Sequence, residues 1–184
     1  MTYFVSMRTV IMLSALLAAG CQSRPGVGRD DLTFAVREGD VAQVRALLAK
    51  GADPNRPAGV NDWPPLMHAV HKNQLGTAEA LLELGADVNK GGPEGMTPLM
   101  MAAGYGNDDM VELLLRHHAD PYVKTTDGAG ALDFALTGVS DIDKFTLFRC
   151  QDSTVELLVR DHPELRATTT ASSRTFARVK RCAS

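Results

Sequence analysis

Two histidines, His68 and His71, have the spacing of metal ligands. They lie three positions apart in a predicted helix, so both imidazoles project from one face and could hold the same metal ion. A stable site needs a third and a fourth ligand, and Asp62 is the only further candidate nearby in the sequence. We therefore interpret both residues as exposed histidines on a helix face and predict no metal site.

Other reactive side chains are explained by ordinary structure. Adjacent histidines point in different directions along a helix and chelate poorly, which applies to His117-His118. Methionine thioethers can bind Cu(I), but Met100 and Met110 fall at repeated apolar positions that indicate a core. Two carboxylate pairs stand at the starts of predicted helices, where negative charge is favoured: Asp30-Asp31 and Asp108-Asp109. The sequence has no Gly-rich phosphate loop, GxSxG, HExxH or CxxC pattern, so we predict no catalytic residues and no cofactor.

Charge is distributed unevenly along the 184 residues. Residues 166–184 contain five basic residues and no acidic one, and we interpret this tail as solvated or loosely docked. The segment Cys21–Leu165 holds 13 Lys and Arg against 22 Asp and Glu, a net charge of about −9. An acidic body repels phosphates, so we predict that the protein does not bind nucleic acid.

The first twenty residues resemble a targeting segment rather than part of the fold. The apolar run at 9–20 is short for a membrane span and fits a signal-peptide core. It ends in LAAGC (17–21), which resembles the lipobox of bacterial lipoproteins and implies acylation of Cys21. Gln22 then implies the outer membrane, facing the periplasm, with 21–29 as a flexible tether. A plain secretory signal cut nearby is the alternative.

Two further cysteines, Cys150 and Cys182, remain if Cys21 is acylated. In an oxidising periplasm a disulfide between them is favoured, and two free thiols are the alternative. The chain-entropy estimate for closing this loop is roughly 3–4 kcal/mol.

An internal repeat organises the body of the chain. Leu-x-x-Ala recurs at spacings of 34, 33 and 33 residues: Leu32/Ala35, Leu66/Ala69, Leu99/Ala102 and Leu132/Ala135. A second apolar cluster follows each pair, at 44–55, 78–89, 111–122 and 155–165. Each unit predicts two helices and a turn, with Thr97 and Pro98 starting one helix and Gly51 and Gly85 ending two others. One such unit cannot bury its apolar face alone, so the units must stack.

The sequence EGMTPLMMAAGYGN (94–107), followed by VELLLRHHAD (111–120), resembles ankyrin repeats. The resemblance implies an all-α solenoid of about four helix-turn-helix repeats, joined by β-hairpin loops, over residues 30–165. The repeats fall at about 30–60, 61–93, 94–126 and 127–165, with an insertion near 138–152 in the last. His118 departs from the pattern because it stands where the first two repeats have a helix-ending glycine.

The ankyrin resemblance implies that a partner protein meets a concave face built from hairpin tips and first helices. Carried onto this sequence, that face presents Trp63, His68, Met96, Met101, Tyr105 and Phe134. Trp63 is the only Trp, and Trp and Tyr are enriched in binding hot spots, although Trp63 could instead pack on the neighbouring hairpin. We expect a monomeric, membrane-tethered recognition module. By analogy with small bacterial envelope ankyrin proteins, it would be an inhibitor or immunity protein for a secreted toxic enzyme, or a stress-protection accessory for a periplasmic enzyme.

Overall fold

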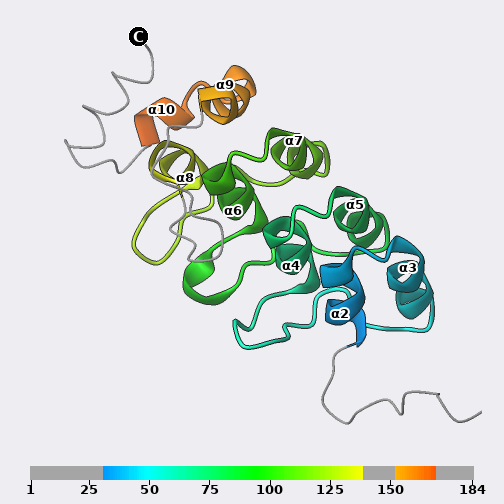
Figure 1. The fold of residues 1–184 in the computed structure, drawn as a ribbon. Helices are drawn as coiled ribbons and strands as arrows, with labels where there is room; N and C mark the ends of the chain where they lie inside the picture. Colours follow the sequence, from blue (N-terminus) through cyan, green and yellow to red (C-terminus); the bar gives the residue numbers. More distant parts are fainter. Residues whose placement is uncertain (1–30, 139–151, 169–184) are drawn as a thin grey trace, which may run out of the picture.

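The computed structural model describes residues 31–138 and 152–168 (Figure 1). The predicted leader (1–20) and tether (21–29) lie outside these residues, together with most of the insertion and most of the basic tail. The lipidation site and the disulfide partners predicted from the sequence also lie outside them: Cys21, Cys150 and Cys182.

Each predicted repeat contains one pair of helices. The first helices of the four pairs are α2 (Asp31–Glu38), α4 (Pro65–His71), α6 (Pro98–Tyr105) and α8 (Ala131–Thr137). The second helices are α3 (Val41–Ala49), α5 (Leu75–Glu83), α7 (Asp108–Arg116) and α9 (Asp152–Asp161). Two short elements complete the described chain: a 3-10 turn η1 (Pro93–Gly95) and α10 (Leu165–Thr168), which covers the start of the predicted basic tail.

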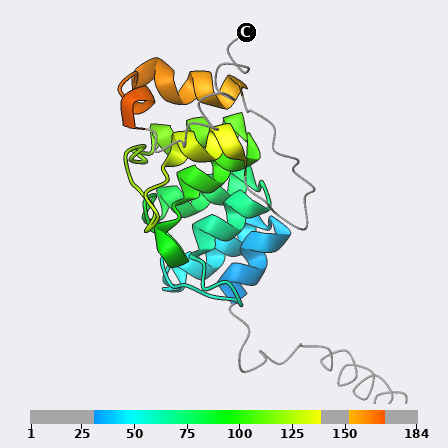
Figure 2. The same cartoon turned by 90° about the vertical axis from the view of Figure 1, so that its left-hand side faces the viewer.

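The helices are arranged in two layers. Figure 1 shows α2, α4, α6 and α8 side by side in one row and α3, α5, α7 and α9 in a second row. Figure 2 shows the same pairs following one another from α2 at one end to α9 and α10 at the other. Within the described residues the loops contain no strand, only an isolated antiparallel bridge between Ala58 and Trp63, so the predicted β-hairpins are present as tight loops.

Helix starts and ends follow the predicted chemistry. The Thr97 hydroxyl accepts a hydrogen bond from Met100 N at 3.3 Å, and Pro98 occupies the first turn of α6, where its missing N–H costs nothing. Gly51 and Gly85 follow α3 and α5 with φ of 91° and 97°, in the left-handed region where a Cβ is disfavoured. These four predictions are confirmed.

The core is built from the repeated leucines and alanines. Leu32, Leu66, Leu99 and Leu132 are all buried, and the alanines three positions later are at most 1% exposed: Ala35, Ala69, Ala102 and Ala135. Small alanines let neighbouring first helices approach closely, so each layer covers the apolar side of the next. Met100 and Met110 are also buried, which confirms that they are core residues.

Asparagine side chains join successive repeats at the bases of the loops. Asn55 accepts a hydrogen bond from Asp87 N at 2.7 Å and donates to Gly85 O at 3.1 Å, one repeat further on. Asn89 accepts from Asp120 N at 2.9 Å in the same way. These bonds satisfy backbone groups across the layers and fix the register of the stack.

In the described part of the chain, we find no helix that combines the length and the apolar character needed to span a membrane.

His118 adopts the conformation of the two helix-ending glycines. Its φ is 64°, and its N–H bonds to Leu115 O at 2.9 Å, as those of Gly51 and Gly85 bond to Leu48 O and Leu82 O. A residue with a Cβ in the left-handed region costs roughly 1–2 kcal/mol of stability. Replacing it by glycine recovers only part of this free energy, because glycine has the larger conformational entropy in the unfolded chain.

His118→Gly should therefore raise the free energy of unfolding by about 0.5–1 kcal/mol, measured by urea titration of the full chain. The matched control is Gly85→Ala, which should lower it, since an added Cβ meets no atom within 4 Å and only the backbone conformation is strained. A His118→Gly protein no more stable than the parent would contradict this account.

Candidate partner-binding site

Four rings from repeats two and three come together in one group, which we call the aromatic cluster: Trp63, His68, His71 and Tyr105. The Trp63 ring lies 5.6 Å from His68 and 5.4 Å from His71, between ring centroids, in tilted geometry. His71 lies 6.0 Å from Tyr105 by the same measure, and its Nδ1 is 2.9 Å from the Tyr105 hydroxyl. Tilted aromatic pairs at these distances are mutually stabilising.

The loop that carries Trp63 is fixed at its base. Ala58 N donates to Trp63 O at 3.0 Å, and His68 Nε2 lies 3.1 Å from Ala58 O, so the imidazole joins the loop to α4. On the other side, Trp63 packs against Gly92 of the next loop, where an added Cβ would lie 2.7 Å from Trp63 Cδ1. Trp63 therefore packs on the neighbouring loop while part of its side chain still faces outward.

The structure corrects the expected exposure of three predicted contact residues. His68 is 5% exposed, Met101 is 1% exposed and Tyr105 is 9% exposed, so none of the three side chains offers appreciable surface. His68 is covered because the Ala58–Trp63 loop folds over it, and it is therefore not the exposed helix-face histidine that the sequence indicated. Met101 is covered because every residue of α6 is buried between neighbouring elements.

The other predicted contact residues keep some surface. Trp63, Met96 and Phe134 are half-buried against the core. Met96 follows η1 in the second loop, and Phe134 lies in α8, one repeat beyond Tyr105. Among the described residues, no ring contact joins Phe134 to the aromatic cluster. The structure thus unites Trp63, His68 and Tyr105 in one cluster and places Met96 and Phe134 elsewhere against the core.

His71 belongs to the cluster although we considered it only as a metal ligand. It is half-buried, contacts Trp63 and bonds to Tyr105, 34 positions further on. The repeat length of 33 to 34 residues could have predicted this contact, because residues about one repeat apart become neighbours once the repeats stack. In the described residues there is no group of three or more His, Cys, Asp or Glu side chains able to hold a metal ion.

The pKa of Asp127 is shifted by its surroundings in the third loop, away from the cluster. The Thr125 hydroxyl donates to Asp127, and this hydrogen bond, with the backbone N–H groups of Asp127 and Ala129, lowers the pKa of the exposed carboxyl. Further hydrogen bonds order the same loop: Thr125 N also donates to Ala129 O at 2.9 Å.

Stacked two-helix layers, joined by loops that cross from each second helix to the next first helix, define a helical repeat solenoid. The chain belongs to the ankyrin-repeat family, whose repeats match it in three overlapping copies, at residues 8–92, 32–125 and 84–168. Ankyrin repeats are protein-interaction modules, and binding another protein is the general role of this chain.

Curated relatives share a short stretch with this chain. Over 50 residues it is 54% identical to the BTB/POZ domain and ankyrin repeat-containing protein NBCL of Lotus japonicus and to NPR5 of Oryza sativa subsp. japonica. It is 52% identical over 50 residues to the regulatory protein NPR6 of Arabidopsis thaliana. Each match covers 27% of this chain and 10–11% of the relative, so the chain corresponds to about a tenth of these proteins.

The tight contact at Gly92 can be tested through the single Trp. Gly92→Ala should displace the Trp63 ring, because the new Cβ would lie 2.7 Å from its Cδ1, and should shift Trp fluorescence to the red as the indole gains solvent. Gly76→Ala is the control, since the nearest atom to its added Cβ is Val41 Cγ2 at 3.3 Å. An unchanged emission spectrum in Gly92→Ala would show that Trp63 is not held in this way.

Proposed function

We propose that this protein recognises a partner protein on the face formed by its first helices and loops, with the aromatic cluster at the centre, and that it catalyses nothing. The observation that carries the proposal is a partly exposed Trp63 held in place from three sides: by Ala58, by His68 and His71, and by Gly92. An aromatic anchor that is already ordered loses little conformational entropy on binding, which favours tight contacts.

The half-buried side chains outside the cluster extend the proposed surface. Met96 lies in the same loop as Gly92, just after η1, and Phe134 lies in α8, the first helix of the last repeat. Met is an adaptable contact residue and Phe a large one, so they would surround the aromatic anchor with apolar area. The relatives named as regulatory proteins, and the ankyrin family itself, support a non-catalytic role.

The proposed place of action is the bacterial envelope. Its support is the resemblance of LAAGC (17–21) to a lipobox and of 1–20 to a signal peptide. An acyl anchor at Cys21 would hold the repeat domain at the outer membrane on the periplasmic side, and two or more chains make such anchoring stable. A disulfide between Cys150 and Cys182 would suit the same oxidising compartment.

An inhibitor or immunity role is favoured, within this proposal, by the charge of the domain. The described residues hold 19 Asp and Glu against 10 Lys and Arg, a net charge of −9. Such a charge steers a basic partner toward the domain and speeds association. A basic secreted enzyme is therefore the preferred partner, and a stress-sensitive periplasmic enzyme is the second choice.

Replacing Trp63 should strongly weaken partner capture without unfolding the domain. Trp63→Leu keeps an apolar side chain over His68 and His71 but loses the indole, and a hot-spot residue of this kind contributes about 2 kcal/mol or more, roughly a 30-fold loss of affinity. The measurement is quantitative mass spectrometry of envelope proteins captured on the full chain. Leu84→Ala is the control, because Leu84 is 42% exposed at the end of α5, in the other helix layer.

If Trp63→Leu and Leu84→Ala captured the same proteins equally well, the aromatic cluster would not be the binding site. Thermal unfolding of both variants should stay within a few degrees of the parent, which separates loss of contact from loss of fold.

The envelope anchor has its own test. Cys21→Ser should abolish acylation, because serine cannot receive the thioether-linked lipid. Intact mass of the parent should exceed that of the mature polypeptide by the mass of the acyl chains. A parent protein that lacks the acyl mass would contradict lipid anchoring but leave partner binding untouched.

A further inference from the structure

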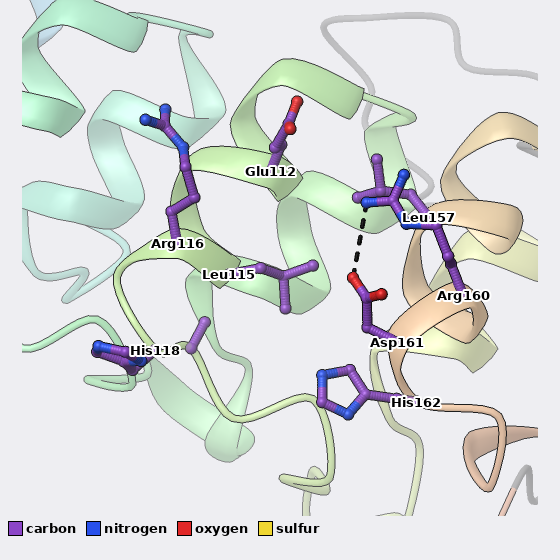
Figure 3. A pocket seen from close by; sticks show the side chains of 9 residues that line it. Glu112, Leu115, Arg116, His118, Leu157, Arg160, Asp161 and His162 are labelled. Atoms are coloured by element: carbon purple, nitrogen blue, oxygen red, sulfur yellow. Dashed lines mark ion pairs between the residues drawn. The ribbon is translucent and has the colours of Figure 1, made fainter.

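A cleft opens between the second helices α7 and α9, in the helix layer opposite the aromatic cluster. Its volume is about 440 Å³, within the range typical of small-molecule sites. Figure 3 shows Leu115 in the middle, Arg116 and His118 on one side, and Arg160, Asp161 and His162 on the other. Leu115, Ala119 and Leu157 give the cleft an apolar floor, and Leu115 and Leu157 are only half-buried.

The same short sequence borders both sides of this cleft. The ends of α7 and α9 each carry Arg-x-His, as Arg116–His118 and Arg160–His162. The equivalent positions of the first two repeats are Ala49-Lys50-Gly51 and Glu83-Leu84-Gly85, which lack both side chains. Two guanidinium groups and two imidazoles are thus concentrated at the one junction between second helices where the cleft lies.

Two departures from the repeat pattern occur at this place. His118 takes a left-handed φ of 64° where glycine would be unstrained, and strained residues cluster at binding sites. Tyr122 stands where Asn55 and Asn89 stand in the earlier repeats, and its hydroxyl lies 3.2 Å from His162 Nδ1 with the rings edge to face. Tyr122 therefore positions one of the imidazoles that line the cleft.

Acidic groups in the cleft leave at least one guanidinium accessible. Asp161 pairs with Arg160 at 3.6 Å, but the two are adjacent in sequence and both 64% exposed, so this is a weak surface pair that a better-placed carboxylate can replace. Glu112 lies at the top of Figure 3, on the α7 side. Arg116 forms no ion pair with a carboxylate in the described residues.

We propose that the α7–α9 cleft binds a small organic carboxylate with an apolar body. The guanidinium of Arg160 or Arg116 would take the carboxylate through paired N–H donors, the geometry for which arginine is suited. His162 and His118 would add a donor at the rim, and the apolar body would lie on Leu115 and Leu157. This site is independent of the partner surface around Trp63.

The test is a titration of the full chain, labelled with ¹³C at leucine methyl groups, with 4-methylpentanoate. The Leu115 and Leu157 methyl signals should shift saturably, with a dissociation constant that is millimolar or tighter for a ligand of this size. The uncharged 4-methylpentanamide should bind at least about fivefold more weakly, because it cannot form the charge-assisted bonds. The amine 4-methylpentylamine, which carries the opposite charge, tests whether the cleft prefers a cation.

Variants identify the groups that hold the ligand. Arg160→Gln and Arg116→Gln together should weaken carboxylate binding about tenfold or more, whereas Arg37→Gln, exposed on α2, should leave it unchanged. His118→Gly should weaken it about two- to threefold. Equal affinity for the acid and the amide, shifts that avoid Leu115 and Leu157, or an unaffected double arginine variant would each overturn the proposal. Preference for the amine would overturn it in favour of a cation site at Glu112 and Asp161.

Discussion

The structure depends on the burial of one helix pair's apolar side against the next. Each helix pair forms a single layer, so an inner helix is covered by neighbours on several sides. Helix α6 packs against α4, α7 and α8, and all of its residues are buried. The alanine three positions after each repeated leucine makes this possible. Its one-carbon side chain lets helix backbones come close enough for the leucines to interdigitate. A pair removed from the stack would expose its apolar face to water, so stability belongs to the array and not to any single repeat.

Stacking at a fixed period also creates the candidate site. Residues about one repeat apart become neighbours in adjacent layers, which is how His71 meets Tyr105, 34 positions on, and how Asn55 reaches Asp87, 32 positions on. Trp63 is placed by the same geometry, between α4 and the loop of the following repeat. The cluster therefore combines residues of two repeats, and its rigidity is inherited from the stack.

The last repeat joins the others by different means. Where Asn55 and Asn89 link the earlier loops, the third repeat uses Tyr122, which contacts His162 at the end of α9, and the Thr154 hydroxyl donates to Asp108 at the start of α7. The end of α7 carries a strained His118 in place of glycine. A cleft with an apolar floor and charged sides results, and the two helix layers of the domain thus offer two chemically different surfaces.

The sequence by itself determined the repeat, the helix pairs, their caps and the core, because each follows from local patterns: leucine spacing, Thr97-Pro98 at a helix start, and glycine where φ is positive. It also located Trp63 and Tyr105 at the binding face proposed for the protein.

Only the tertiary structure decided which side chains remain exposed there. His68 and Met101 occupy equivalent positions on first helices, and both are covered, by a folded loop and by neighbouring helices respectively. Exposure depends on what lies across from a residue, and one-dimensional periodicity does not specify that. The partnership of His71 with Tyr105 and the cleft between α7 and α9 arise for the same reason, from contacts between residues far apart in the chain.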